Sequence, residues 1–222
     1  MAMLRQVKAG VGALVALYLP AHAMAQDGPT AQQILFEVRQ NQTEQHREVE
    51  GQLRVEDRVM PFRLTFNGEE IRYAFTNPPQ TLILKLGESG SQLFDQTKGS
   101  AQKISPARFD EKVRDTDIAY EDLALRFLYW PKARIDGEEL KLTRRCWKLH
   151  LEPATRTESS YAVVLLWVDK ESGAFLQAEA YGADGKIKKR FKITSSKQMR
   201  IEELSGLNSR DKSPTYLEIQ KR

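Results

Sequence analysis

The sequence contains little of what most catalytic or metal-binding sites are built from. Of its 222 residues one is a cysteine, Cys146, and three are histidines, His22, His46 and His150. A single cysteine cannot form an intrachain disulfide. Neither His46 nor His150 stands at metal-ligand spacing from a cysteine or carboxylate, and no serine lies in a G-x-S-x-G setting. The sequence therefore favours a protein that is not an enzyme and that uses no metal or cofactor.

Two features look reactive but have simpler interpretations. Glu69-Glu70 and Glu121-Asp122 are adjacent carboxylate pairs. Successive side chains point in different directions, so we interpret both pairs as solvent-exposed faces or helix caps. Cys146 is typical of a small buried residue on a strand. The sequence does not indicate what further role this thiol has.

Charge of one sign and long apolar runs are also scarce. Residues 11–19 form an apolar run, and this run is too short to span a bilayer. Arg5 and Lys8 precede it, and Ala23-Met24-Ala25 offers the small residues that signal peptidase accepts. We expect residues 1–25 to be a cleaved secretory signal peptide, with an uncleaved anchor as the alternative. No cysteine lies near this cleavage site, so we do not expect a lipoprotein.

Removal of this segment lowers the net charge. Arg5 and Lys8 are its only charged residues, so the formal net charge of +4 decreases by two. A charge this small gives no electrostatic reason to expect nucleic-acid binding. With 41% hydrophobic and 29% charged residues, the remainder has the composition of a soluble globular protein. We expect residues 26–222 to form a single, monomeric domain in the periplasm.

Two or three helices are expected. Thr30 and Gln33 have the spacing of a capping box, and Ile34, Leu35 and Val38 then form an apolar stripe. A second helix is expected over residues 118–129, capped by Asp117 and ended by Trp130-Pro131.

The rest of the chain alternates with a period of two, which is typical of β-strands. The connections are short, and Asn67-Gly68 is a strong hairpin signal, so the strands should be antiparallel. The expected strands are residues 49–55, 60–66, 71–75, 81–86, 92–95, 133–142, 145–152, 161–169, 174–181, 186–194 and 215–220.

A sheet this wide cannot stay flat, because strands twist. Two helices can cover only part of its concave face. We therefore predict a mainly β (α+β) fold: an incomplete antiparallel β-barrel, or strongly curved sheet, with a helical lid over an apolar hollow.

An apolar hollow suits a ligand with long acyl chains and needs no fixed charge inside. One alternating face of several strands is the predicted cavity lining, although the same residues suit an ordinary core. This lining comprises Met60, Phe62, Leu64, Phe66, Ile71, Tyr73, Phe75, Leu82, Leu84, Tyr161, Val163, Leu165 and Trp167. The predicted lid residues are Ile34, Leu35, Val38, Leu123 and Phe127.

A basic face marks the strand near residue 190. Alternation places Lys186, Lys188, Arg190 and Lys192 on one face, opposite Ile187, Lys189, Phe191 and Ile193. Such a charge run is usually a solvated face. The functional alternative is a rim that contacts a membrane with anionic lipid headgroups, or a partner.

Three stretches resemble a known family in order and spacing: TDIAYEDLALRF, RRCWKLHLEP and VVLLWVDKESGAFLQAEAYGADGKIKKRF. They are similar to motifs of the outer-membrane lipoprotein-sorting proteins, the LolA-like carriers, over residues 117–193. The matching residues are Asp117, Tyr120, Glu121, Asp122, Leu123, Cys146, Trp147, Leu149, Leu166, Trp167, Val168, Asp169, Lys170, Glu179, Tyr181, Gly185 and Lys186.

This resemblance implies an incomplete barrel closed by helices, which carries lipoprotein acyl chains, or similar lipids, toward the outer membrane. It also implies an inner-membrane donor complex and an outer-membrane acceptor as partners. Proteobacterial carriers place an arginine ahead of an early strand to latch the lid, whereas here Arg72 is shifted into the strand. The alternatives are a sensor of envelope lipoprotein stress with this fold, which binds a membrane partner, and an enzyme acting on lipids. The missing catalytic set argues against the enzyme.

Overall fold

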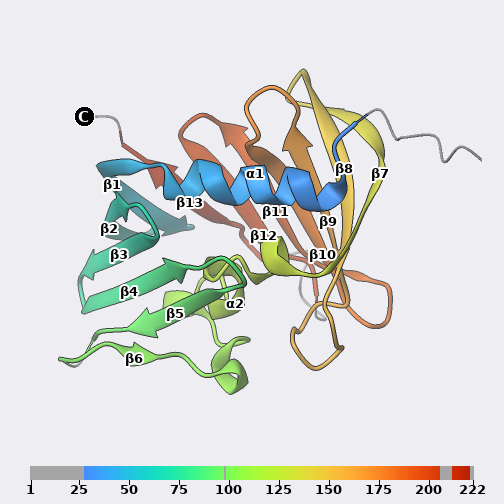
Figure 1. Ribbon diagram of the computed structural model, residues 1–222. Coiled ribbons are helices and arrows are strands. Elements are labelled where there is room, and N and C mark those ends of the chain that lie inside the picture. Colours follow the sequence, from blue (N-terminus) through green and yellow to red (C-terminus); the bar gives the residue numbers. More distant parts are fainter. Residues whose placement is uncertain (1–27, 98, 206–211, 221–222) are drawn as a thin grey trace, which may run out of the picture.

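One curled antiparallel sheet makes up most of the molecule (Figure 1). The computed structural model describes residues 28–97, 99–205 and 212–220, so the predicted signal peptide lies outside the described residues. The thirteen strands follow the order β6-β5-β4-β3-β2-β1-β13-β12-β11-β10-β9-β8-β7. The two edge strands, β6 and β7, do not pair, so the barrel is incomplete, as predicted.

The strand bounds agree with most of the expected runs. They are β1 (His46–Val55), β2 (Arg58–Asn67), β3 (Glu70–Thr76), β4 (Pro79–Leu86), β5 (Ser91–Asp95), β6 (Gln102–Lys103), β7 (Lys132–Lys141), β8 (Arg144–Glu152), β9 (Val163–Asp169), β10 (Phe175–Tyr181), β11 (Ile187–Ser195), β12 (Gln198–Glu203) and β13 (Thr215–Ile219). The sequence did not predict β12 or the two-residue β6.

The topology explains how the concave face is covered. β6 and β7 are consecutive in sequence but lie at opposite edges of the sheet. The connecting segment, residues 104–131, must therefore cross from one edge to the other. Its apolar side chains, among them Ile104, Val113, Ile118 and Leu128, are buried in the main core together with those of the sheet. The connection itself is thus part of the cover.

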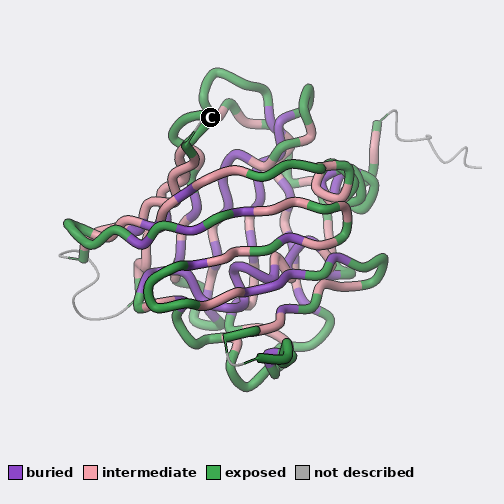
Figure 2. The backbone as a smooth tube through the Cα atoms, turned by 90° about the vertical axis from the view of Figure 1, so that its left-hand side faces the viewer, coloured by how far each residue is buried: buried purple, intermediate pink, exposed green. Residues whose placement is uncertain are grey.

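Helix α1 (Ala31–Thr43) supplies the rest of the cover and lies across the strands in Figure 1. Its predicted capping box is confirmed: the Gln33 amide donates to Thr30 Oγ1, and the Thr30 amide donates to Gln33 Oε1. Ile34, Leu35 and Val38 face the core and are almost completely buried. Figure 2 shows where the sheet is buried: buried positions lie along the strands, whereas the turns that connect them are exposed.

The second predicted helix is wrong in its length and its cap. Only α2 (Tyr120–Leu123) and the 3-10 turn η3 (Arg126–Tyr129) form, separated by Leu125 at φ 50°. Two more 3-10 turns, η1 (Pro106–Arg108) and η2 (Val113–Asp115), lie earlier in the connection. Most apolar side chains between residues 118 and 130 are buried around the segment, which suits a compact plug better than a helix with a single apolar stripe. The backbone amide of Asp117, the predicted cap, donates to Thr215 Oγ1 instead.

Strand β9 is apolar on both faces because each face meets a different cluster. Val164, Leu166 and Val168 belong to the main core inside the curl. Leu165 and Trp167 pack with Cys146 and Leu176 in a small cluster on the other face. Cys146 is fully buried, as predicted.

Candidate functional site

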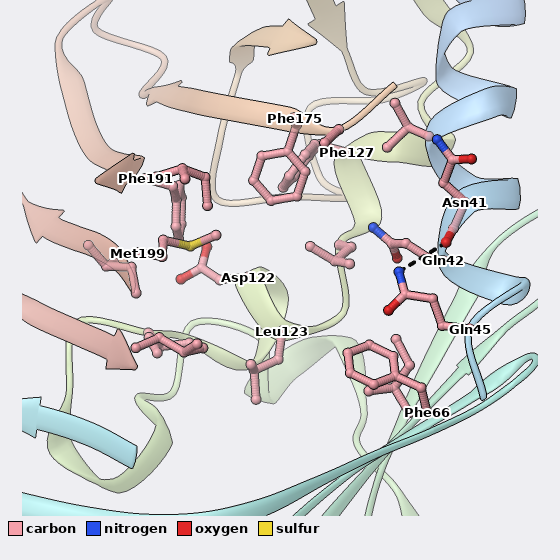
Figure 3. A pocket seen from close by; sticks show the side chains of 18 of the residues that line it. Asn41, Gln42, Gln45, Phe66, Asp122, Leu123, Phe127, Phe175, Phe191 and Met199 are labelled. Atoms are coloured by element: carbon pink, nitrogen blue, oxygen red, sulfur yellow. Dashed lines mark hydrogen bonds between the residues drawn. The ribbon is translucent and has the colours of Figure 1, made fainter. Parts of the chain in front are cut away.

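A cavity of about 560 Å³ lies between the inner face of the sheet and its cover of α1 and residues 118–127. Small-molecule sites commonly have volumes of about 300–1,000 Å³. Most of the lining is apolar (Figure 3). The apolar residues are Val38, Phe66, Ile71, Tyr73, Ile118, Leu123, Leu125, Phe127, Ala174, Phe175, Phe191, Ile193, Met199, Ile201 and Leu217.

The polar residues of the lining lie at two ends of the cavity. Asn41, Gln42 and Gln45 come from the C-terminal end of α1 and the residues just after it, while Asp122 lies on the opposite side, beside Met199 (Figure 3). Arg47, Ser172 and Gly173 complete the polar lining. An elongated ligand with one polar end matches this arrangement.

Asp122 is the centre of a buried polar network. Its Oδ2 accepts hydrogen bonds from the Ala119 amide at 2.7 Å and from Lys189 Nζ at 2.6 Å, and its Oδ1 accepts from the Tyr161 hydroxyl at 2.8 Å. Burial, and then the negative charge of Asp122, raise the pKa of Tyr161 well above its ordinary value. The expectation of a hollow without fixed charge is therefore wrong, although Lys189 neutralises the carboxylate.

Glu121 is also buried, so the predicted solvent-exposed face is wrong for this pair. The alternative, a helix cap, is confirmed for Asp122, which accepts from the Ala119 amide at the start of α2. The Glu121 carboxylate accepts hydrogen bonds from the hydroxyls of Ser159 and Ser160 and from the Ser160 amide. The pair is buried because both carboxylates find donors in segments distant in sequence. Together, these bonds fasten the connecting segment to β11 and to the loop before β9.

Six of the predicted lining and lid residues do lie on the cavity: Phe66, Ile71, Tyr73, Val38, Leu123 and Phe127. Tyr73 is half-buried, and desolvation of its hydroxyl raises the pKa of this group to about 12. These residues come from β2, β3, α1 and the connecting segment. The structure thus brings together residues from both the predicted lining and the predicted lid.

A second group of predicted residues lies in the core but not on the cavity. Phe62, for example, packs against Phe75 with ring centroids 5.5 Å apart. These side chains are covered by protein neighbours, so they support the cavity wall without forming its surface. They are Ile34, Leu35, Met60, Phe62, Leu64, Phe75, Leu82, Leu84 and Tyr161.

The choice of face on β9 needs correction. Leu165 and Trp167 point away from the cavity into the small cluster with Cys146. The half-buried Val163, two residues before Leu165, lies on the same face of the strand. The inward face carries Val164, Leu166 and Val168 instead. Trp167 is held outside, where its indole Nε1 donates to Glu139 Oε2 at 2.9 Å. A hydrogen bond from Lys148 is the main cause that lowers the pKa of Glu139 to about 2.

The sequence interpretation missed the part of the lining that comes from β10 to β13. Phe191 and Ile193 alternate with the basic residues of β11, so their inward direction was readable from the sequence. Met199, Ile201 and Leu217 lie on adjacent strands and pair across them. Their short strands gave only two apolar positions each, which is a weak periodic signal.

The predicted basic face is partly paired. Arg190 Nε lies 2.9 Å from Glu179 Oε1, and the Arg190 guanidinium lies 3.8 Å from Glu202. Lys188 Nζ donates to the Ser160 carbonyl at 3.4 Å. Lys186 and Lys192 are exposed. The structure keeps these residues away from the cavity lining, and a membrane role for them stays a prediction.

Polar contacts hold α1 over the cavity at both ends. Arg39 donates to the Leu128 carbonyl at 2.5 Å and lies 5.1 Å from the centroid of the Tyr129 ring. Gln32 donates to the carbonyls of Trp130 and Pro131, each at 3.0 Å. Burial lowers the pKa of Arg39. α1 is thus attached to the connecting segment by three side-chain hydrogen bonds.

Asn41 attaches the other end of α1, where its Nδ2 donates to the Ser172 carbonyl at 3.1 Å. Ser172 lies in the turn between β9 and β10, and this turn also lines the cavity. Within the described ranges, no group of three or more histidine, cysteine or acidic side chains has metal-binding geometry. No helix in the same ranges is long and apolar enough to cross a membrane.

Comparisons with known proteins agree with this architecture. A family model described as "Uncharacterized protein" matches residues 75–221, which is more than half of the chain. No curated protein matches the sequence.

Three solved structures share the fold. A protein described as an outer membrane lipoprotein-sorting protein domain, from Vibrio parahaemolyticus, superposes with a TM-score of 0.65 at 14% identity, covering 86% of this chain and 90% of that chain. A DUF1329 family protein from Desulfovibrio piger gives 0.64 at 16%, covering 86% and 91%. A LolA superfamily protein from Nitrosomonas europaea gives 0.59 at 17%, covering 87% and 93%. The predicted resemblance to LolA-like proteins is therefore confirmed for the fold.

Proposed function

The chain belongs to the family described as "Uncharacterized protein", whose model spans residues 75–221, and has the LolA-like fold; from this premise we propose that it is a periplasmic lipid carrier. In this proposal residues 1–25 direct export and are removed, and residues 26–222 act as one carrier domain. The carrier binds acyl chains of lipoproteins or similar lipids in its cavity and delivers them toward the outer membrane.

The cavity is the observation that carries this proposal. Its surface is mostly aliphatic and aromatic, and its one buried carboxylate, Asp122, is paired with Lys189. Transfer of an acyl chain from water into such a surface is worth about 0.8 kcal/mol per methylene. A long chain therefore binds without specific polar contacts, which suits a carrier that accepts more than one client.

Release requires the cover to move. The polar attachment of α1 rests on the side chains of Gln32, Arg39 and Asn41, all of which bond to backbone carbonyls. Net contributions of about 0.5–1.5 kcal/mol for each neutral hydrogen bond, and about 1.5–3 kcal/mol for that of the charged Arg39, are small compared with a cooperative core. We assign the role of a movable lid to α1. An inner-membrane donor and an outer-membrane acceptor would act on this element.

A cavity-filling substitution tests the proposal. Met199 of β12 lines the cavity, while Tyr216 of the neighbouring β13 packs on the opposite face against Arg54, 4.4 Å from its ring centroid. We expect Met199→Trp to weaken binding of a fluorescent acyl probe by at least about tenfold, because the indole takes up ligand volume. Tyr216→Trp, the matched control, should bind like the wild type.

Native mass spectrometry of the protein purified from its own periplasm provides a second readout. We expect an acylated species to co-purify with the wild type and to be reduced in Met199→Trp. A wild-type protein that neither carries an acylated species nor binds the probe would overturn the proposal. Equal probe binding by Met199→Trp and Tyr216→Trp would show that the acyl chain does not enter this cavity.

A further inference from the structure

Two side-chain oxygens at the α1 end of the cavity have no donor. Gln42 Oε1 and Gln45 Oε1 are both buried from solvent, and neither accepts a hydrogen bond from any described residue. Both residues line the cavity (Figure 3). A buried acceptor without a donor costs about 1–3 kcal/mol, so folded proteins rarely leave two of them side by side.

The orientation of the Gln45 amide is fixed by its neighbour. Gln45 Nε2 donates to the backbone carbonyl of Asn41 at 3.0 Å. A carbonyl oxygen can only accept, so exchanging the nitrogen and oxygen of this amide would place two acceptors against each other. Oε1 must therefore face away from Asn41.

The other polar groups at this end do not satisfy these oxygens. Asn41 Nδ2 already donates to the Ser172 carbonyl, and the Arg47 guanidinium stacks on Phe66, 5.0 Å from the ring centroid. The last turn of α1 contains no basic side chain, although a helix C-terminus favours donors and cations. Two acceptors at this end therefore lack donors, while Gln42 Nε2 is the one side-chain amide nitrogen there without a described acceptor.

The opposite end differs, because the Asp122 carboxylate there already accepts hydrogen bonds from donors of the protein. Ala119, Tyr161 and Lys189 supply three hydrogen bonds to its carboxylate. A ligand gains little by placing a donor there. The demand for a donor is confined to Gln42 and Gln45.

From this asymmetry we infer that the ligand is an amphiphile whose polar head donates hydrogen bonds, through amide N–H or hydroxyl groups, to Gln42 Oε1 and Gln45 Oε1. Its apolar chain extends from there past Phe127 and Phe175 toward Phe191 (Figure 3). This inference rests on the proposed function and specifies its ligand class. Lipids whose heads only accept hydrogen bonds, such as simple esters, leave both oxygens unpaired and bind less well.

A pair of matched ligands tests this inference. Dodecanamide and methyl dodecanoate are both uncharged and share the same chain, but only the amide carries N–H donors. Each is titrated as a competitor of a fluorescent acyl probe, and the ratio of the two dissociation constants is compared between proteins. This comparison cancels the different hydration of the two ligands.

We expect the preference for the amide to fall by about tenfold in the Gln42→Met, Gln45→Met double variant, because both acceptors are removed at nearly constant side-chain length. Affinity for the ester should stay the same or rise. Gln40→Met is the control: Gln40 lies on the same helix but is exposed and does not line the cavity, so the preference should not change.

The outcomes separate this inference from the proposed function. If both ligands displace the probe but the ratio is the same in the wild type and the double variant, the ligand-class inference is overturned and the carrier proposal stands. If the wild type binds neither the probe nor either ligand, the carrier proposal fails as well. Gln42→Glu gives an independent check: its added negative charge should raise the affinity for dodecylammonium by at least about threefold, and an unchanged affinity contradicts the inference.

Discussion

Lys189 and Asp122 form a buried ion pair, with 2.6 Å between Nζ and Oδ2 and at most 4% of either side chain exposed. The pair joins β11 to α2 across 67 residues of sequence. Removing one member of such a pair leaves the other as an uncompensated buried charge. We therefore expect Lys189→Met to lower the free energy of unfolding by about 3–5 kcal/mol, measured by urea denaturation.

The same measurement on the Lys189→Met, Asp122→Asn double variant shows whether the charge is the cause. Asparagine keeps a side-chain oxygen for the Ala119 amide but carries no charge. The double variant should therefore be more stable than Lys189→Met alone. Equal or lower stability of the double variant would show that the cost comes from lost packing.

Gly173 touches the side chain that anchors the C-terminal end of α1. It has φ 65°, and a Cβ added to it would lie 2.6 Å from Asn41 Nδ2. Gly173→Ala must therefore break the bond between Asn41 and Ser172, in addition to straining the backbone. We expect it to destabilise the protein by about 1 kcal/mol more than Gly185→Ala does.

Gly185 is the matched control because it has φ 72° and nothing within 4 Å of an added Cβ. Both substitutions carry the backbone cost, and only Gly173→Ala displaces a neighbour. Thermal and urea unfolding of both variants measure the difference. In an Asn41→Ala background the two alanine substitutions should cost the same, and a persistent gap would point to another contact.

Arg39 is the strongest polar attachment of α1 to the connecting segment. It donates to the Leu128 carbonyl and stacks on the Tyr129 ring. Hydrogen bonds to charged groups contribute about 1.5–3 kcal/mol. We expect Arg39→Met to increase amide hydrogen exchange in α1 by at least about tenfold, measured by mass spectrometry.

The exposed Glu37→Ala on the same helix is the control and should leave the exchange of α1 nearly unchanged. The amides of β8 and β9 should keep their protection in Arg39→Met, because opening is local to the lid. Loss of protection throughout the sheet would contradict an independently moving α1.

Protonation of Glu218 in β13 should make part of the free energy of unfolding depend on pH in the acidic range. The pKa of this carboxyl is lowered to about 2. The largest cause is a hydrogen bond from Arg54, and the next is one from Gln52. The folded state therefore takes up this proton less readily than the unfolded state. Its stabilisation is complete above pH about 4.5 and is lost as the pH falls from there toward 2.

We expect Glu218→Gln to lose about 1 kcal/mol at pH 7, because the partly exposed pair is weakened by solvent. The difference from the wild type should vanish near pH 2. Urea denaturation across this pH range measures it. Glu88→Gln, which removes an exposed carboxylate in the turn between β4 and β5, is the control for net charge. A constant difference at every pH would exclude the ionic origin.

Features that depend on neighbours in sequence were predictable. The capping box at Thr30 and the hairpin at Asn67-Gly68 are local, and both appear where the sequence indicates them. The curled, mainly β architecture follows from the number of alternating strands and their short connections. Phe66, Ile71 and Tyr73 of the cavity lining were also predicted, because alternation on β2 and β3 correctly separated inward from outward side chains.

Features that depend on distant partners were not predictable. β9 is apolar on both faces, so only its packing decides that Leu166 points inward and Trp167 outward. Glu121 and Asp122 are buried because Ser159, Ser160 and Lys189 supply donors from elsewhere in the chain. The helix expected over residues 118–129 failed for a similar reason, since the segment is buried on several sides.

The pairing of β13 with both β1 and β12 determines the order in which the fold can be completed. Residues 46–95 and 132–203 can form two half-sheets by local hairpins, but the strand that joins them comes last in the sequence. Contacts of such high sequence separation form slowly. Until β13 inserts, β1 and β12 present open edges on which another chain could pair. The period before this insertion is therefore when the protein is most exposed to misassembly, and a chaperone would protect it most by covering these two edges.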